Sequence, residues 1–189
     1  MNHITGLAAA LILAIGAAAA APASAAEPFN ITSPAFRDGG KMPLKYGAVA
    51  LPNGKKCAGQ NISPPLRWSH VPKGTKSFAI TMYDPAGAGG IGVLHWLAYD
   101  IPASVHGFAE GETSKPAKTF VGGKNQPGTT LYFGSCPPPG DKPHPYVITL
   151  IALDLAPGTL PAGLAHDAFI QAIRGHNLGA TTLVGRYGR

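Results

Sequence analysis

The chain has 189 residues, a formal net charge of +6, and 45% hydrophobic residues. This hydrophobic fraction is too high for a disordered chain, and the length suits one domain with its own core. We find no internal repeat or heptad pattern, which excludes a solenoid or a coiled coil. The basic residues are scattered and no nucleic-acid-binding motif is present, so the charge points weakly to anionic partners and not to nucleic acid.

The first 26 residues have the layout of a secretory signal peptide. Residues 1–26 contain no acid, Lys or Arg, and a long apolar run ends at Pro22 before a series of small residues. This pattern predicts cleavage after Ala25 or Ala26. An uncleaved anchor or a wrongly assigned start is the alternative. We therefore expect residues 27–189 to form one periplasmic or secreted domain with no membrane span after cleavage.

Short extended segments separated by Gly and Pro turns dominate the rest of the chain. The clearest is 76–84 (KSFAITMYD), whose alternation places Phe78, Ile80 and Met82 on one face of a strand. Further strands are expected over 93–101 and 146–154, and a segment that can only begin or edge a strand over 61–68, because it contains Pro64 and Pro65.

Helical spacing occurs only late in the chain. Residues 165–175 (AHDAFIQAIRG) predict a helix that ends at Gly175, and 181–189 is ambiguous. The whole pattern predicts a mainly β fold, an antiparallel sandwich or barrel with a few short helices, chiefly C-terminal.

A first candidate for chemistry is the pair Asp84 and His95. Asp84 ends one predicted strand and opens a Gly-rich loop, and His95 lies in the next strand. The loop lacks the lysine and the spacing of a P-loop, which argues against a nucleotide site. Alternatively, Asp84 is a turn former before Pro85 and His95 is a core histidine.

A second candidate lies between residues 134 and 146. The segment 134–140 (GSCPPPG) has a stiff backbone whose preceding amides could receive an anion, or it is simply a rigid loop. His144 and Tyr146 lie two apart at a strand start and so share a face. Ser135 lacks the setting of a hydrolase nucleophile, and no local spacing supports a metal site. The residues alone predict a small polar pocket for an anion.

The chain has two cysteines, Cys57 and Cys136. Because export places them in an oxidising compartment, we expect one disulfide between them. Two buried, reduced thiols are the alternative.

Six motifs in order resemble the phosphatidylethanolamine-binding protein family, and in particular its bacterial Raf kinase inhibitor-like branch. They are ITSPAF (31–36), CAGQNISPPLRW (57–68), MYDPAG (82–87), LHWLAYDIPA (94–103), YFGSCPPPGDKPHPY (132–146) and ALD (152–154). The resemblance runs from about residue 29 to the end of the chain. It implies an antiparallel β-sandwich with a small pocket for phosphate-type anions, including phospholipid head groups. It assigns pocket roles to Asp84, His95, His144 and Tyr146, and a rim loop to Gly134, Ser135, Cys136 and Pro138.

One departure from the family pattern falls beside this pocket. The family usually reads DPDAP, whereas residues 84–88 read DPAGA. The change removes a negative charge and a stiffening proline from the pocket wall.

The expected function is an exported binding protein for a small anionic or phosphorylated ligand, one that could inhibit another protein. No cofactor or metal is expected. The alternatives are a hydrolase that uses His95 and His144 as acid and base, and a protein-interaction module with a vestigial pocket.

Overall fold

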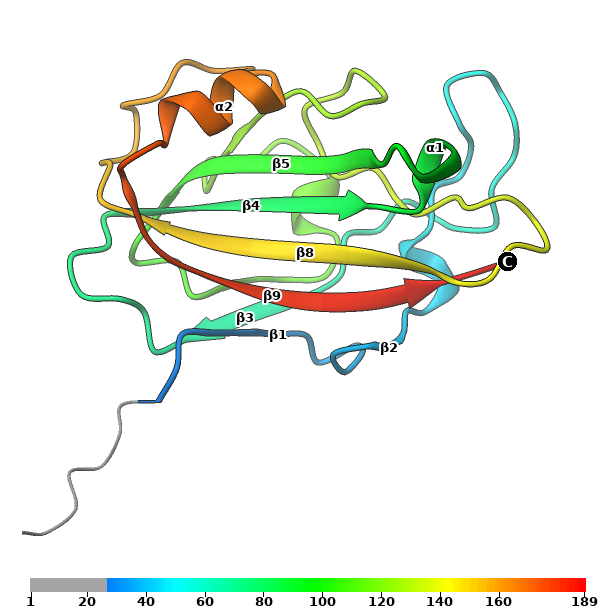
Figure 1. Ribbon diagram of the computed structural model, residues 1–189, viewed down its shortest axis with the longest axis horizontal. Helices are drawn as coiled ribbons and strands as arrows, with labels where there is room; N and C mark the ends of the chain where they lie inside the picture. Colours follow the sequence, from blue (N-terminus) through cyan, green and yellow to red (C-terminus); the bar gives the residue numbers. More distant parts are fainter. Residues whose placement is uncertain (1–26) are drawn as a thin grey trace, which may run out of the picture.

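A six-stranded sheet, in the order β2-β9-β8-β4-β5-β7, forms the centre of the computed structural model, which describes residues 27–189 (Figure 1). Neighbouring strands are antiparallel, except that β2 runs parallel to β9. The predicted signal peptide lies outside the described residues. The strands are β2 (Gly40–Lys41), β4 (Ser77–Asp84), β5 (Val93–Pro102), β7 (Val121–Gly122), β8 (His144–Leu153) and β9 (Asn177–Tyr187).

A smaller three-stranded sheet packs on one face of the large sheet. It consists of β1 (Asn30–Thr32), β3 (Leu66–Ser69) and β6 (Gly107–Phe108), all antiparallel. The main core lies between the sheets, where the Trp68 ring meets the rings of Phe78 and Phe108 edge-on at 5.5 and 5.6 Å. The predicted β-sandwich is confirmed.

The opposite face of the large sheet carries a second core under helix α2 (His166–Ala172). There Phe169 is fully buried and stacks on Tyr99 of β5 with ring centroids 5.5 Å apart. Because helix and small sheet cover opposite faces, β4 is buried on both sides. Its predicted alternation is confirmed, since Phe78, Ile80 and Met82 face the sandwich core and Ala79 faces the helix side.

The predicted elements differ from the structure mainly at their ends. Strand β3 begins only after the two prolines of 61–68, and α2 ends before Gly175, which has a left-handed φ of 85°. The ambiguous end of the chain belongs to β9, the longest strand, which pairs along the whole of β8. The short helices η1 (Leu44–Tyr46), α1 (Gly87–Gly90) and η2 (Glu112–Ser114) complete the fold.

Within residues 27–189, no helix is long and apolar enough to cross a membrane.

Candidate ligand-binding site

A cavity of about 530 Å³ opens at one end of the large sheet, and we call it the main pocket. Strand β4 ends there, and β5 and β8, its antiparallel neighbours, begin there, beside α1 (Figure 1). This pairing brings Asp84, His95, His144 and Tyr146 together although they are far apart in the sequence. All four predicted pocket residues line the cavity.

Asp84 and His144 form a buried pair in its wall. Nδ1 of His144 donates a hydrogen bond to Oδ2 of Asp84 over 2.8 Å, and the two residues are 8% and 2% exposed. The second carboxylate oxygen accepts from the Ala86 amide. A buried carboxylate is costly unless it is satisfied in this way. The wall is tight here, because a Cβ at Gly87 would lie 3.1 Å from Asp84 Oδ2 and 2.7 Å from Val93.

The His144 ring also faces a second carboxylate. Its Nε2 lies 3.4 Å from Oδ2 of Asp141, which is exposed and lines the same pocket. The imidazole therefore lies between a buried carboxylate and a solvent-facing one, and each ring nitrogen faces an acid.

His95 has a different environment. Its Nδ1 donates to the carbonyl oxygen of Phe133, and the Asn125 amide donates to the His95 carbonyl, each over 3.1 Å. Burial lowers the pKa of His95, outweighing the hydrogen bond to Phe133 and the nearby charge of Asp84, which raise it. With Nδ1 donating and the ring neutral, Nε2 carries a lone pair. His95 is thus an acceptor near neutral pH.

Tyr146 completes the polar wall. It is fully buried, and its ring meets the His95 ring edge-on with centroids 5.1 Å apart. Burial, and secondarily the charge of Asp84, raises the pKa of the Tyr146 hydroxyl. The hydroxyl therefore keeps its proton and remains a donor at all physiological pH values.

The predicted rim loop divides into two parts. Cys136 and Pro138 line the main pocket, whereas Gly134 and Ser135 are not among the lining residues. The Gly134 amide donates to Oδ1 of Asn61 over 2.8 Å, and Ser135 is fully buried. Gly134 and Ser135 therefore lie beneath the lining of the pocket and not on its surface.

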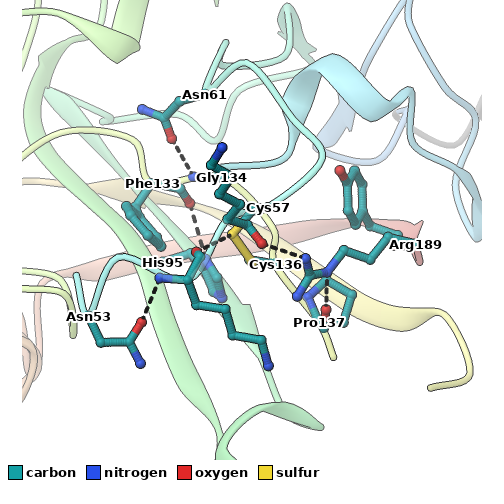
Figure 2. Close-up of a disulfide and its surroundings, with 12 residues drawn as sticks. Asn53, Cys57, Asn61, His95, Phe133, Gly134, Cys136, Pro137 and Arg189 are labelled. Atoms are coloured by element: carbon teal, nitrogen blue, oxygen red, sulfur yellow. Dashed lines mark hydrogen bonds between the residues drawn. A yellow bond between two sulfur atoms is a disulfide. The ribbon is translucent and has the colours of Figure 1, made fainter. Parts of the chain in front are cut away.

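The predicted disulfide joins Cys57 to Cys136, with Cα atoms 5.6 Å apart (Figure 2). It ties the segment before Asn61 to the pocket rim. The guanidinium of Arg189 spans the same two segments, because it donates to the carbonyl oxygens of Lys56 and Pro137, each of which neighbours a cysteine.

The departure from the family motif has a backbone consequence. Ala88 has a left-handed φ of 50°, which a proline, whose ring holds φ near about −65°, cannot adopt. The loop after Asp84 is therefore built differently from one that carries the family's second proline.

Several lining residues were missed by sequence reasoning, notably Asp141, Leu51, Gln126 and Phe133. They lie in loops outside the named strands, although the amides of Gln126 and Phe133 donate to carbonyl oxygens of β5. Only Asp141 and Phe133 fall within a recognised motif. Among residues 27–189, no group of three His, Cys, Asp or Glu is arranged to hold a metal ion.

The chain is similar to proteins of one known family in both sequence and structure. Residues 32–188 match the family model described as phosphatidylethanolamine-binding protein. LppC of Mycobacterium tuberculosis, which its name describes as a lipoprotein, is 38% identical over 169 residues, or 89% of this chain and 77% of that protein. A UPF0098 protein of Methanothermobacter thermautotrophicus is 35% identical over 162 residues, or 85% of this chain and 99% of the relative. The crystal structure of Escherichia coli YbcL superposes with a TM-score of 0.74 at 31% identity, covering 85% of this chain and 98% of that one.

Proposed function

Because the chain belongs to the phosphatidylethanolamine-binding protein family, we propose that the main pocket binds a small zwitterionic phosphate, of which an ethanolamine phosphate is the simplest example. The observation that carries this proposal is the position of His144 between Asp84 and Asp141. Nε2 of His144 can donate to a phosphate oxygen, and the neighbouring carboxylate of Asp141 can accept from a cationic group.

The donors and acceptors of the pocket fit the two ends of such a ligand. A phosphate oxygen at Nε2 of His144 receives a charge-assisted hydrogen bond, and the Tyr146 hydroxyl supplies a second donor. The oxygen takes the place of Asp141, which at 3.4 Å is only weakly engaged with the ring. The freed carboxylate and the Nε2 lone pair of His95 then accept from the ammonium group.

The charge of the lining supports a zwitterion over a simple dianion. Among residues 27–189, two carboxylates and no Lys or Arg line the main pocket. A phosphate alone would meet these acids without support from a charged His95, because burial lowers the pKa of that ring. An ammonium on the same ligand offsets the second carboxylate.

We further propose that residues 27–189 form the mature domain and act outside the cytoplasm. The signal-like segment 1–26 supports export, and so does the disulfide, since such bonds persist in oxidising compartments. The lipoprotein name of the relative LppC is consistent with the same location. We favour binding over turnover because, among residues 27–189, no Ser, Thr or free Cys lines the main pocket beside His144.

Titration calorimetry with three probes tests the proposal. O-Phosphoethanolamine should bind more tightly than inorganic phosphate, and ethanolamine alone should bind most weakly. Native mass spectrometry of exported protein should show a co-purified phosphate-bearing ligand. Equal affinities for O-phosphoethanolamine and phosphate would contradict a zwitterion site, and no binding of either would contradict the assignment of the pocket.

A further inference from the structure

A second cavity, of about 550 Å³, adjoins the main pocket and shares Asp141 with it. We call it the cationic cavity, because Lys41, Arg186 and Arg189 line it. Within the part of the chain that the structure describes, its lining holds one acid, Asp141, against three cations. The described residues that line the main pocket have the opposite charge balance, with two carboxylates and no Lys or Arg.

Strand pairing places two of these cations side by side. Lys41 on β2 and Arg186 on β9 are register partners in the parallel pair at the sheet edge, and Arg186 O accepts from the Met42 amide over 2.8 Å. Like charges directly opposite one another destabilise a sheet. Among residues 27–189, neither side chain has a carboxylate within ion-pair distance to offset this repulsion. An anion between them would do so.

The third cation is held in place before any ligand arrives. The Arg189 guanidinium uses two of its N–H groups on the carbonyls of Lys56 and Pro137 (Figure 2). A guanidinium has five N–H donors in a fixed plane, so three remain. A group fixed in this way loses little side-chain entropy when it binds an oxyanion.

We propose that the cationic cavity is a binding site for a phosphate-type oxyanion, separate from the main pocket. Arg186 and Arg189 provide planar donors that match the spacing of phosphate oxygens, and Lys41 adds a point charge. The negative charge of Asp141 is directed in part toward His144, whose Nε2 lies 3.4 Å away. The net charge of the lining is therefore positive, and the inference does not depend on what the main pocket binds.

NMR titration with sodium phosphate tests this site directly, with sodium chloride used to hold the ionic strength constant. The backbone amides of Lys41 and Gly188 report on the cationic cavity, and those of Gly87 and His95 report on the main pocket. In the wild type, the first two amides should shift along one saturable curve. In Arg186→Gln, that curve should move to roughly tenfold higher phosphate, while the curve of the main-pocket amides stays in place.

Lys73→Gln is the matched control, since it removes one exposed positive charge in the turn before β4, away from both cavities. Lys41→Gln provides a second variant and should weaken binding in the same direction as Arg186→Gln. The proposal is overturned if the Lys41 and Gly188 amides fail to shift in the wild type, or if Arg186→Gln and Lys73→Gln behave alike.

A vesicle experiment separates two sources of the oxyanion. Co-sedimentation with phosphatidylglycerol vesicles, absent with phosphatidylcholine vesicles and lost in Arg186→Gln, would identify a lipid head group as the ligand. Saturable binding of inorganic phosphate without co-sedimentation would identify a free anion. Both results support the site. Co-sedimentation that Arg186→Gln leaves intact, together with no phosphate response at Lys41 and Gly188, would contradict it.

Discussion

Asp84 and His144 are joined by a 2.8 Å hydrogen bond in which the imidazole Nδ1 donates to the carboxylate, and both residues are buried. Asp84 ends β4 and His144 begins β8, so the hydrogen bond connects these two adjacent strands at the end of the sheet where the pocket lies. Loss of either partner leaves the other buried and unpaired, which is more costly than loss of both.

A double-mutant cycle measures this coupling. Asp84→Ala should lower the free energy of unfolding by about 3 kcal/mol, because it leaves the imidazole and the Ala86 amide without their acceptor. The double variant Asp84→Ala/His144→Ala should cost clearly less than the sum of the single variants, by about 1–3 kcal/mol. Urea unfolding at pH 7 provides all four values, and additive costs would show that the pair is not coupled.

Asp141 should oppose the binding of a simple anion. Its carboxylate lies 3.4 Å from His144 Nε2, at the position that a phosphate oxygen would occupy. Asp141→Asn should therefore bind inorganic phosphate about fivefold more tightly, on the basis of a screened surface charge. O-Phosphoethanolamine should gain less, because the same change removes an acceptor for its ammonium group. Calorimetry with both probes checks this, and an unchanged phosphate affinity would rule out a role for Asp141 in the pocket.

The buried His95 should make the fold sensitive to acid. Burial lowers its pKa in the folded state, whereas the unfolded chain protonates it near about pH 6.5. The unfolded state then binds more protons, so stability is present above this pH and is lost as the pH falls through and below it. One such group contributes a slope of at most about 1.4 kcal/mol per pH unit.

His95→Asn isolates this effect, because the Asn amide can still donate to Phe133 but does not titrate. Its stability, from urea unfolding between pH 7.5 and 5, should fall less steeply with acid than that of the wild type. His106→Asn alters an exposed histidine and should keep the wild-type slope. Identical slopes for all three proteins would show that His95 does not control acid stability.

The disulfide should stabilise the fold and shape the pocket rim. Cys57 and Cys136 are separated by 79 positions, for which loop-closure entropy predicts a loss of about 4.5 kcal/mol in Cys57→Ser/Cys136→Ser. Because Cys136 and Pro138 line the main pocket, affinity for O-phosphoethanolamine should fall as well. Dithiothreitol should reproduce both effects in the wild type and change nothing in the variant. Equal stability of the wild type and the variant toward heat and urea would contradict a stabilising role for the disulfide.

The sequence predicted those parts of the fold that depend on local pattern. Alternation in 76–84 identified both faces of β4, because successive side chains there face the two cores in turn. The pattern failed where pairing is non-local: β9 contains Gly179 and Gly185, which weaken the strand pattern, and it is a strand because β8 lies beside it.

In the candidate site, too, features of local pattern were predictable and those that depend on distant segments were not. Asp84, His95, His144 and Tyr146 were found because they occupy strand ends within recognisable motifs, and the strand pairing brings them together. The different surroundings of the two histidine rings were not predictable, because Asp141 and Phe133 reach the rings from loops. Arg189 was likewise recognised only as one scattered basic residue, although it spans both disulfide-linked segments.

Titration calorimetry of O-phosphoethanolamine at pH 6 and pH 8, on the wild type and on His144→Ala, tests the proposed function most directly. The wild type should bind more tightly at pH 6 than at pH 8, because imidazoles in general gain a proton over this range and a charged ring at this position, between Asp84 and Asp141, would donate a stronger hydrogen bond to the phosphate. His144→Ala should bind roughly tenfold to hundredfold more weakly at pH 6. The phosphate ionises near about pH 6 in both experiments, so the difference between the two proteins isolates the histidine. His106→Ala serves as the exposed-histidine control and should match the wild type. Equal affinity of wild type and His144→Ala at both pH values would contradict the account.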